Sequence, residues 1–146
     1  YKPFSSDERI PKFARKYYSL DSNPMGWNGV YFDYDPSRDE LDAVFTDGHD
    51  HALLKAGCGH YAFCDFTAVR FQPKIHFTPD TDHSHLASSY RITDGCVEIE
   101  VRFLNCPHKL IIAAKTDSDG EHIDISLTCG NINMGPSSHL TGTLAE

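Results

Sequence analysis

Alternation of hydrophobic and polar residues is clearest between Ser88 and Cys129, where it predicts four consecutive antiparallel strands. The segment 97–103 alternates strictly between apolar and polar side chains, as expected of a strand with one buried face. The Asp94-Gly95 pair before it is a strong hairpin signal, because a tight turn of this type needs positive φ at both central residues. We therefore expect a meander of four neighbouring strands over about 88–129.

The expected register of these strands gathers the apolar side chains on one face. Closing the first hairpin at Asp94-Gly95 pairs Arg91 with Glu98 on the polar face. A second turn, predicted over 117–120, places Thr116 opposite Glu121. The apolar face then holds Tyr90, Ile92, Val97, Ile99, Val101, Phe103, Leu110, Ile112, Ala114, Ile123, Ile125 and Leu127. A sheet with one apolar face needs a covering layer, which the first half of the chain has to supply.

Two helical regions are predicted in that first half. Apolar residues at three- to four-residue spacing predict a short helix over 11–18. The stretch Ser37-Arg38-Asp39-Glu40 matches a capping box and predicts one kinked or two short helices that end at Gly57. The other expectations are strands over 30–34, 61–71 and 74–77, a loop over 78–85 and an irregular tail over 130–146. The sequence thus predicts a single α+β domain spanning 1–146, with helices packed on one face of the meander.

Charge narrows the range of partners. The chain has 146 residues and a formal net charge of −8. Nucleic acids and anionic membrane surfaces both attract basic proteins, so we expect neither as a partner. No apolar run approaches membrane-spanning length, and no signal peptide is recognisable. We expect a protein outside the membrane, and we infer no oligomeric state.

Cysteine content favours an oxidising compartment. The candidate disulfide residues are Cys58, Cys64, Cys96, Cys106 and Cys129. Two disulfides and one free thiol are the simplest arrangement for a secreted chain, and the connectivity stays open. The alternative is a set of reduced, buried thiols in a cytosolic protein. We expect a secreted, disulfide-bonded protein.

Two histidine pairs are candidate metal ligands. His49 and His51 form one H-x-H pair, and His83 and His85 form the other. On a strand, side chains at i and i+2 point to the same side and can chelate zinc or copper. His49 and His51 lie beside a predicted helix, where such side chains diverge. The favoured interpretation is therefore polar surface histidines, with no metal and no cofactor.

A second candidate site lies on the polar face of the meander. Glu98, Glu100, Arg102 and His122 share that face, and a carboxylate, a histidine and an arginine are the groups that an acid–base ribonuclease needs. The predicted pairing of Arg91 with Glu98 and the acidic charge of the chain speak against this chemistry. A secreted ribonuclease-like or metal-dependent enzyme is the alternative to a protein without catalytic activity, which we favour.

The short stretches Val69-Arg70-Phe71-Gln72 and Val101-Arg102-Phe103-Leu104 each place a hydrophobic residue after an arginine. In this feature, and in its small acidic chain and odd cysteine number, the sequence resembles secreted effector proteins of plant-infecting fungi. More narrowly, it resembles the LARS structural family of avirulence and suppressor effectors. That resemblance implies a four-stranded sheet backed by helices and tied by disulfides. It also implies a virulence role in which the protein binds a host protein or is sensed by host immune receptors.

Overall fold

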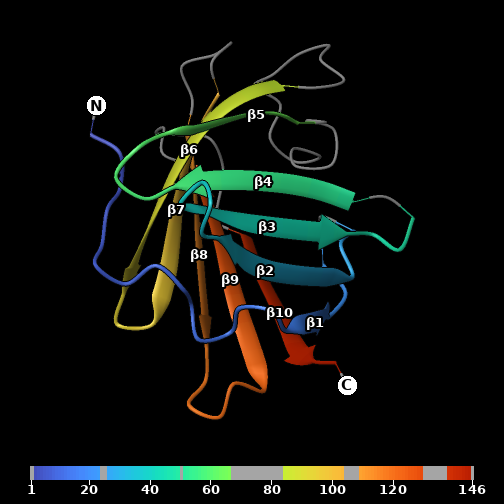
Figure 1. The fold of residues 1–146 in the computed structure, drawn as a ribbon. Helices are drawn as coiled ribbons and strands as arrows, with labels where there is room; N and C mark the ends of the chain where they lie inside the picture. Colours follow the sequence, from blue (N-terminus) through green and yellow to red (C-terminus); the bar gives the residue numbers. More distant parts are fainter. Residues whose placement is uncertain are drawn as a thin grey trace.

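Strands account for all the regular secondary structure in the described part of the chain. The computed structural model describes residues 2–23, 26–49, 51–66, 84–103, 109–129 and 138–145. The strands are β1 (Tyr17–Leu20), β2 (Gly29–Asp35), β3 (Glu40–Thr46), β4 (His51–Gly57), β5 (Ala62–Phe66), β6 (Ser84–Thr93), β7 (Cys96–Phe103), β8 (Lys109–Thr116), β9 (His122–Cys129) and β10 (Ser138–Leu144). Figure 1 shows β2–β4 crossing the steeper strands β7–β10.

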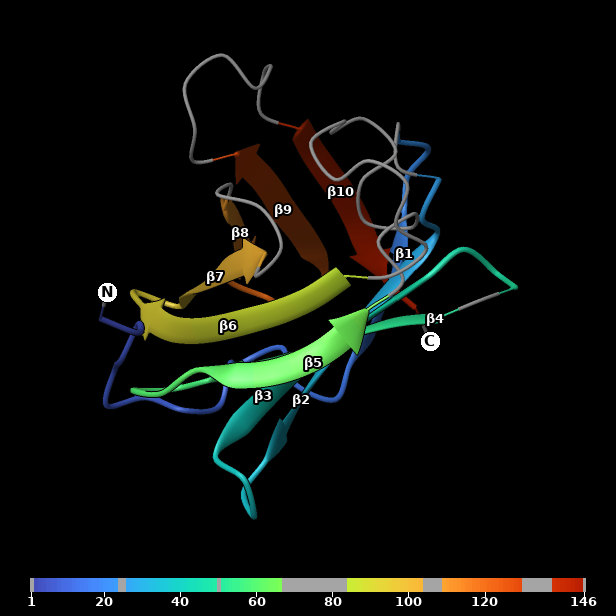
Figure 2. The same cartoon turned by 90° about the horizontal axis from the view of Figure 1, so that it is seen from above.

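Nine of these strands close into a barrel. The order around it is β4-β3-β2-β1-β10-β9-β8-β7-β6, and every neighbouring pair in that order is antiparallel. A single parallel pair, Gly57 with Ser89, joins β4 to β6 and completes the circuit. Strand β5 extends the sheet beyond β6. Figure 2 shows β5 and β6 side by side. The structure is therefore all-β, and the predicted α+β class is wrong.

The barrel interior is apolar. The fully buried residues include Tyr18, Val30, Phe32, Leu41, Phe45, Leu54, Leu86, Tyr90, Val97, Val101, Ile112, Ile125 and Leu140. Trp27 stacks on Phe45 with ring centroids 4.4 Å apart, so it is the core anchor that its burial suggests. Phe13, from the segment before β1, packs edge-on against Phe32 at 5.2 Å. Burial of these side chains supplies the main driving force for closing the sheet.

The predicted helix over 37–57 is replaced by β3 and β4. Leu41, Ala43 and Phe45 are all fully buried, which is the two-residue period of a strand and not the spacing of a helix. Ser37 caps no helix, because its amide and hydroxyl both donate to a carboxylate oxygen of Asp35 in the β2–β3 turn. Short segments with apolar residues at mixed spacings fit both patterns, and pairing with neighbouring strands decided between them.

The ends of the chain also form strands. Residues 12–15 form a turn and β1 follows, so the predicted helix over 11–18 is wrong. The tail was expected to be irregular, yet 138–144 forms β10 between β1 and β9. The predicted strand over 30–34 is confirmed within β2, and β5 confirms the described part of the strand over 61–71. The strand expected over 74–77 and residues 78–83 of the loop expected over 78–85 lie outside the described residues. Residues 84 and 85 begin β6, so the predicted end of that loop is wrong.

The predicted meander is confirmed as β6–β9. The first hairpin has the expected register, with Arg91 opposite Glu98. The register of β8 and β9 differs by two residues, since Thr116 lies opposite Ile123 and not Glu121. The turn begins one residue later than predicted because Asp117 still pairs its amide with the carbonyl of His122. A shift of two residues preserves the faces, so the predicted inward residues whose side chains are described are all buried.

The expected disulfides are contradicted where the structure describes cysteine side chains. Cys58 and Cys96 are both free thiols. Burial raises the pKa of the Cys96 thiol, which favours its protonated form. The side chains of Cys64 and Cys129, and all of Cys106, lie outside the described residues. Among the described residues, the closed hydrogen-bonded sheet and its apolar interior hold the fold.

Candidate functional site

The four residues of the predicted acid–base face do not converge. The Glu98 carboxylate accepts a 2.8 Å hydrogen bond from Arg91. Glu100 is 4% exposed and forms ion pairs with Arg102 at 3.1 Å and Lys109 at 3.7 Å. His122 is at the start of β9, two strands away from β7. The outer face therefore carries local ion pairs and not the shared acid–base centre that a ribonuclease mechanism needs.

The predicted histidine pairs are not assembled either. His49 lies in the β3–β4 turn and His51 begins β4. Neither belongs to a group of three potential metal ligands within the described ranges. His83 lies outside the described residues, and of His85 only the backbone, in β6, is described.

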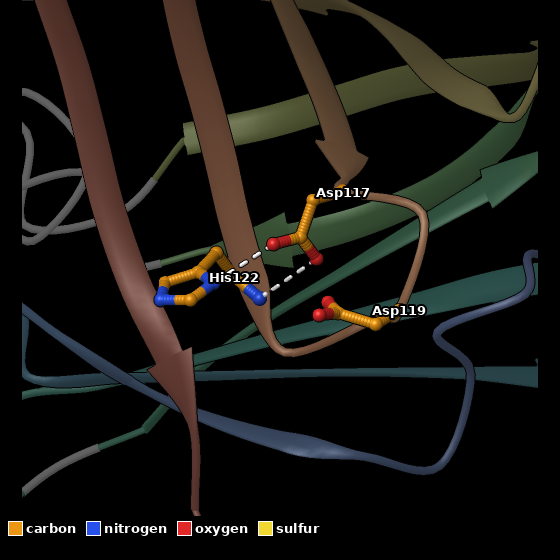
Figure 3. A group of neighbouring side chains, drawn as sticks. All are labelled: Asp117, Asp119 and His122. Atoms are coloured by element: carbon orange, nitrogen blue, oxygen red, sulfur yellow. Dashed lines mark hydrogen bonds and ion pairs between the residues drawn. The ribbon is translucent and has the colours of Figure 1, made fainter.

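One group of potential ligands does come together, at the β8–β9 turn. Ligand atoms of Asp117, Asp119 and His122 all lie within 4.8 Å of one another (Figure 3). The Asp117 carboxylate is 2.8 Å from His122 Nδ1 and accepts the backbone amides of His122 and Glu121 at 3.1 and 3.0 Å. The backbone bond from His122 is the largest of several that lower the pKa of Asp117 to about 2. The hydrogen bond that His122 Nδ1 donates to Asp117 in turn raises the pKa of His122. These contacts explain the cluster as a turn-stabilising network without any ion.

Beside this turn, a groove of about 670 Å³ lies over β8, β9 and β10. Most of the residues that line it are polar or charged, although most of the lining surface itself is apolar. Lys115, Asp124 and Thr141 lie side by side across the three strands. Thr141 donates a 2.7 Å hydrogen bond to Asp21, and His139 lies 3.2 Å from Asp124. Most of the polar side chains in the groove thus have partners within the protein.

The barrel interior contains a polar side chain that lacks a hydrogen-bond partner among the described residues. The inward side chains of β6 include Leu86, Ser88 and Tyr90, all of them completely buried. The Ser88 hydroxyl has no hydrogen-bond partner among the described residues. Its neighbour Ser89, equally buried but on the outer side of the strand, accepts the Phe4 amide at 2.8 Å. Most buried polar groups in proteins are hydrogen-bonded, so the Ser88 hydroxyl needs an explanation.

Small side chains lie on the side of Ser88 that faces β4 and β5. Ala62 of β5 pairs directly with Ser88, and Ala56 is the last inward residue of β4. Both alanines are buried. Barrels of about this size hold either packed side chains or one small ligand. This part of the wall therefore combines short side chains with one free hydroxyl that faces inward.

The fold is similar to that of a known protein. Over 95% of this chain and 100% of the other, the structure matches the crystal structure of a secretary abundant heat soluble (SAHS) protein from Ramazzottius varieornatus. The TM-score is 0.62 and the sequence identity is 9%, so the likeness extends to the fold alone. No protein-family model and no curated protein matches the sequence.

No helix in the described part of the chain is long and apolar enough to cross a membrane.

Sequence reasoning missed the residues that distinguish this interior. Ser88 and Ser89 are adjacent and identical, so the sequence does not tell which one faces a hydrogen-bond partner. Assigning Ser88 to the inward face was possible from its even spacing with Tyr90 and Ile92. The lack of a partner depends on what lies opposite, which only the closed barrel defines.

Proposed function

We propose that the protein is a secreted binding protein without catalytic activity, and that it holds a small apolar molecule with one hydrogen-bonding group inside the barrel. The observation that carries this proposal is the completely buried, unpartnered hydroxyl of Ser88 on the inward face of β6. An unsatisfied buried hydroxyl costs about 1–3 kcal/mol. A ligand that supplies a donor or acceptor there would remove this cost, while the surrounding apolar side chains would favour an apolar body.

Two further features support this proposal over an enzymatic function. Glu98, Glu100 and His122 are separated and individually paired, so they form no general acid–base pair. The inward residues of the described strands are almost entirely apolar and offer no nucleophile with a neighbouring base. Binding requires only a shaped apolar interior with few polar groups.

Titration with N-phenyl-1-naphthylamine, a neutral fluorescent probe with one N–H group, tests the proposal. Methyl NMR spectra can locate the probe because Ile111 and Ile112 are adjacent on β8 but face opposite sides. We expect saturable binding of one probe per chain, with shifts at Ile112 and Ile99 and none at Ile111. Failure to bind at millimolar concentration, or shifts at the outward Ile111 alone, would contradict an interior ligand site.

Secretion is the second part of the proposal. It is supported by the name of the structural neighbour, which describes a secreted heat-soluble protein. A protein with a closed sheet and net charge −8 is also expected to resist aggregation after heating. Recovery of soluble, folded protein after heating and cooling would support a functional parallel with that neighbour, whereas extensive precipitation would argue against it.

A second candidate function is binding to a protein, such as the host protein or immune receptor expected from the effector resemblance. One observation favours it: Tyr17, Tyr31, Val44 and Leu53 form a continuous outward row across β1–β4. Tyr17 and Leu53 are 40% and 41% exposed. Contiguous exposed apolar groups often mark protein interfaces. If this row binds a host protein, Leu53→Asp should abolish binding to that protein while Leu53→Met retains it.

A further inference from the structure

The N-terminal segment contacts the barrel at the place where β4 meets β6. We call residues 4–9 the strap. The Phe4 amide donates to Ser89 Oγ at 2.8 Å, and the Phe4 carbonyl accepts the Gly59 amide at 2.7 Å. The Phe4 ring also lies 4.1 Å from the guanidinium carbon of Arg91. Phe4 thus links β6 to the residues that follow β4, and Figures 1 and 2 both show the N-terminal segment beside this part of the barrel.

Ser6 makes the second connection across the same two elements. Its hydroxyl accepts the backbone amide of Ile92 on β6 at 2.9 Å and donates to the Glu8 carbonyl at 2.8 Å. Its backbone amide donates to the sulfur of Cys58 at 3.4 Å. Cys58 directly follows β4 and is 4% exposed. The strap therefore covers this thiol while it holds β6.

Arg9 completes the strap. Its Nη1 donates to Cys58 Sγ at 2.7 Å and also to the Ser6 carbonyl, while its Nε forms a 3.2 Å ion pair with Asp39. The Arg9 carbonyl accepts the hydroxyl of Tyr90 at 2.8 Å. Tyr90 is an inward residue of β6, so the strap also reaches a side chain of the barrel interior.

The β4–β6 junction needs such support because its own ladder is minimal. Strands β4 and β6 share one residue pair, Gly57 with Ser89, whereas β3 and β4 share the seven pairs from Glu40–Gly57 to Thr46–His51. Elements with few backbone hydrogen bonds open at lower free energy than continuous ladders. Strand β5, which follows β4 after four residues, pairs with β6 over five residues and also connects the two strands. The strap contacts add a second connection across this junction, on the side of Ser89 and Ile92.

We propose that the strap is a gate: docked, it holds the β4–β6 junction closed, and its release opens the interior beside Ser88 to an apolar ligand. This inference rests on the proposed interior site and adds its regulation. Ser88 and Ser89 are neighbours on opposite faces of β6, so the strap anchors directly behind the hydroxyl that would bind the ligand. Undocking accelerates both uptake and release, since both use the same opening.

A covalent lock gives the first test. The hydroxyl oxygen of Ser6 lies 3.9 Å from Cys58 Sγ, so Ser6→Cys places a second sulfur close enough for a disulfide after a small adjustment. Oxidised Ser6→Cys, with the bridge to Cys58 verified by peptide mapping, should take up and release N-phenyl-1-naphthylamine about tenfold more slowly than the reduced protein. Reductant should restore the rates.

The control for the lock is Ser118→Cys, at an exposed position in the β8–β9 turn, which should show no redox dependence. Equal rates in the bridged and reduced Ser6→Cys protein would overturn the gate. Failure of the bridge to form under oxidising conditions would contradict the docked strap itself.

A released strap gives the converse test. The double variant Ser6→Ala/Arg9→Ala removes the Ile92 acceptor and the Arg9 contacts with Cys58 and Asp39. We expect faster amide exchange at Ile92 and Gly59, with both probe rates raised about tenfold and the affinity changed less than threefold. The matched control Lys12→Ala/Ser118→Ala alters exposed residues and should leave both rates unchanged.

The outcomes separate the two proposals. If the wild-type protein and both strap variants bind no probe, the interior site is refuted and the gate with it. If they bind with the same rates although amide exchange shows that the strap is released, only the gate is refuted. Should the double variant fail to fold, the Ser6→Cys lock still decides, because its oxidised and reduced forms are the same polypeptide.

Discussion

Adjacent serines on β6 offer a controlled measurement of one hydrogen bond. Ser88 and Ser89 are both completely buried, but only Ser89 has a partner, the Phe4 amide at 2.8 Å. Ser88→Ala removes an unsatisfied group and should stabilise the ligand-free protein by about 0–1 kcal/mol. Ser89→Ala leaves the Phe4 amide without its acceptor and should destabilise it by about 0.5–1.5 kcal/mol. Both substitutions remove a hydroxyl oxygen, so the difference between their free energies of unfolding measures the effect of the hydrogen-bond partner.

Urea unfolding of the ligand-free proteins measures that difference. With slopes of about 1–3 kcal/mol per molar urea, a gap of about 1.5 kcal/mol separates the two midpoints by about 0.5–1.5 M. With N-phenyl-1-naphthylamine bound, the ranking of the two variants by stability should change, because Ser88→Ala then removes a hydrogen bond to the ligand. We expect this variant to bind the probe about 2- to 13-fold more weakly.

Destabilisation of the ligand-free protein by Ser88→Ala to the same extent as by Ser89→Ala would refute the free hydroxyl. That result would mean that the Ser88 hydroxyl already has a partner, such as a buried water, and that the interior offers no free polar group to a ligand. Equal urea slopes for both variants and the wild type are required for the comparison, since a changed slope would indicate an altered unfolded or native ensemble.

Two other predictions concern the electrostatics and the packing of the sheet. The Asp117 carboxylate raises the pKa of His122, so Asp117→Asn should return its NMR titration midpoint toward the ordinary value of about 6.5. Because the folded pKa is raised, this contact stabilises the protein below about pH 6.5, and its contribution is lost as pH rises through the folded value. An unchanged midpoint would contradict the contact. Gly142→Ala should destabilise by about 1–3 kcal/mol in thermal unfolding, because its Cβ would lie 2.6 Å from the Ser19 carbonyl oxygen. Gly29→Ala should cost less, because its added atom meets the movable end of Tyr17, and equal losses would refute this distinction.

The meander was predictable because its pattern is local. Strict alternation from Val97 to Phe103 and the Asp94-Gly95 turn determine the strands and the first register without reference to the rest of the chain. The predicted register of β8 and β9 was two residues off because the turn between them is positioned by hydrogen bonds to the Asp117 carboxylate. Several residues of a polar turn could accept such bonds, so the sequence does not identify which one does. The inward set survived this error because a shift of two residues keeps every side chain on its face.

The first half of the chain was mispredicted for the opposite reason. Leu41, Val44 and Phe45 fit the spacing of a helix, while Leu41, Ala43 and Phe45 fit a strand, and the local sequence does not choose between them. Hydrogen bonding to β2 and β4 selects the strand. Similarly, β10 has a polar sequence with little strand signal, and it is held by ladders to β1 and β9.

The amino-acid sequence by itself determined which faces of the β6–β9 strands are apolar, the acidic charge, and the separation of the candidate acid–base residues along the chain. Only the tertiary structure decided that the sheet closes on itself, that Cys58 lies beneath the strap, and that Ser88 lacks a partner where Ser89 has one. The physical reason is the distance along the chain over which each kind of interaction acts. Alternation and turn chemistry act over a few residues, whereas closure, thiol coverage and hydrogen-bond satisfaction depend on pairings between residues 32 to 86 positions apart, Gly57 with Ser89 and Ser6 with Ile92 among them.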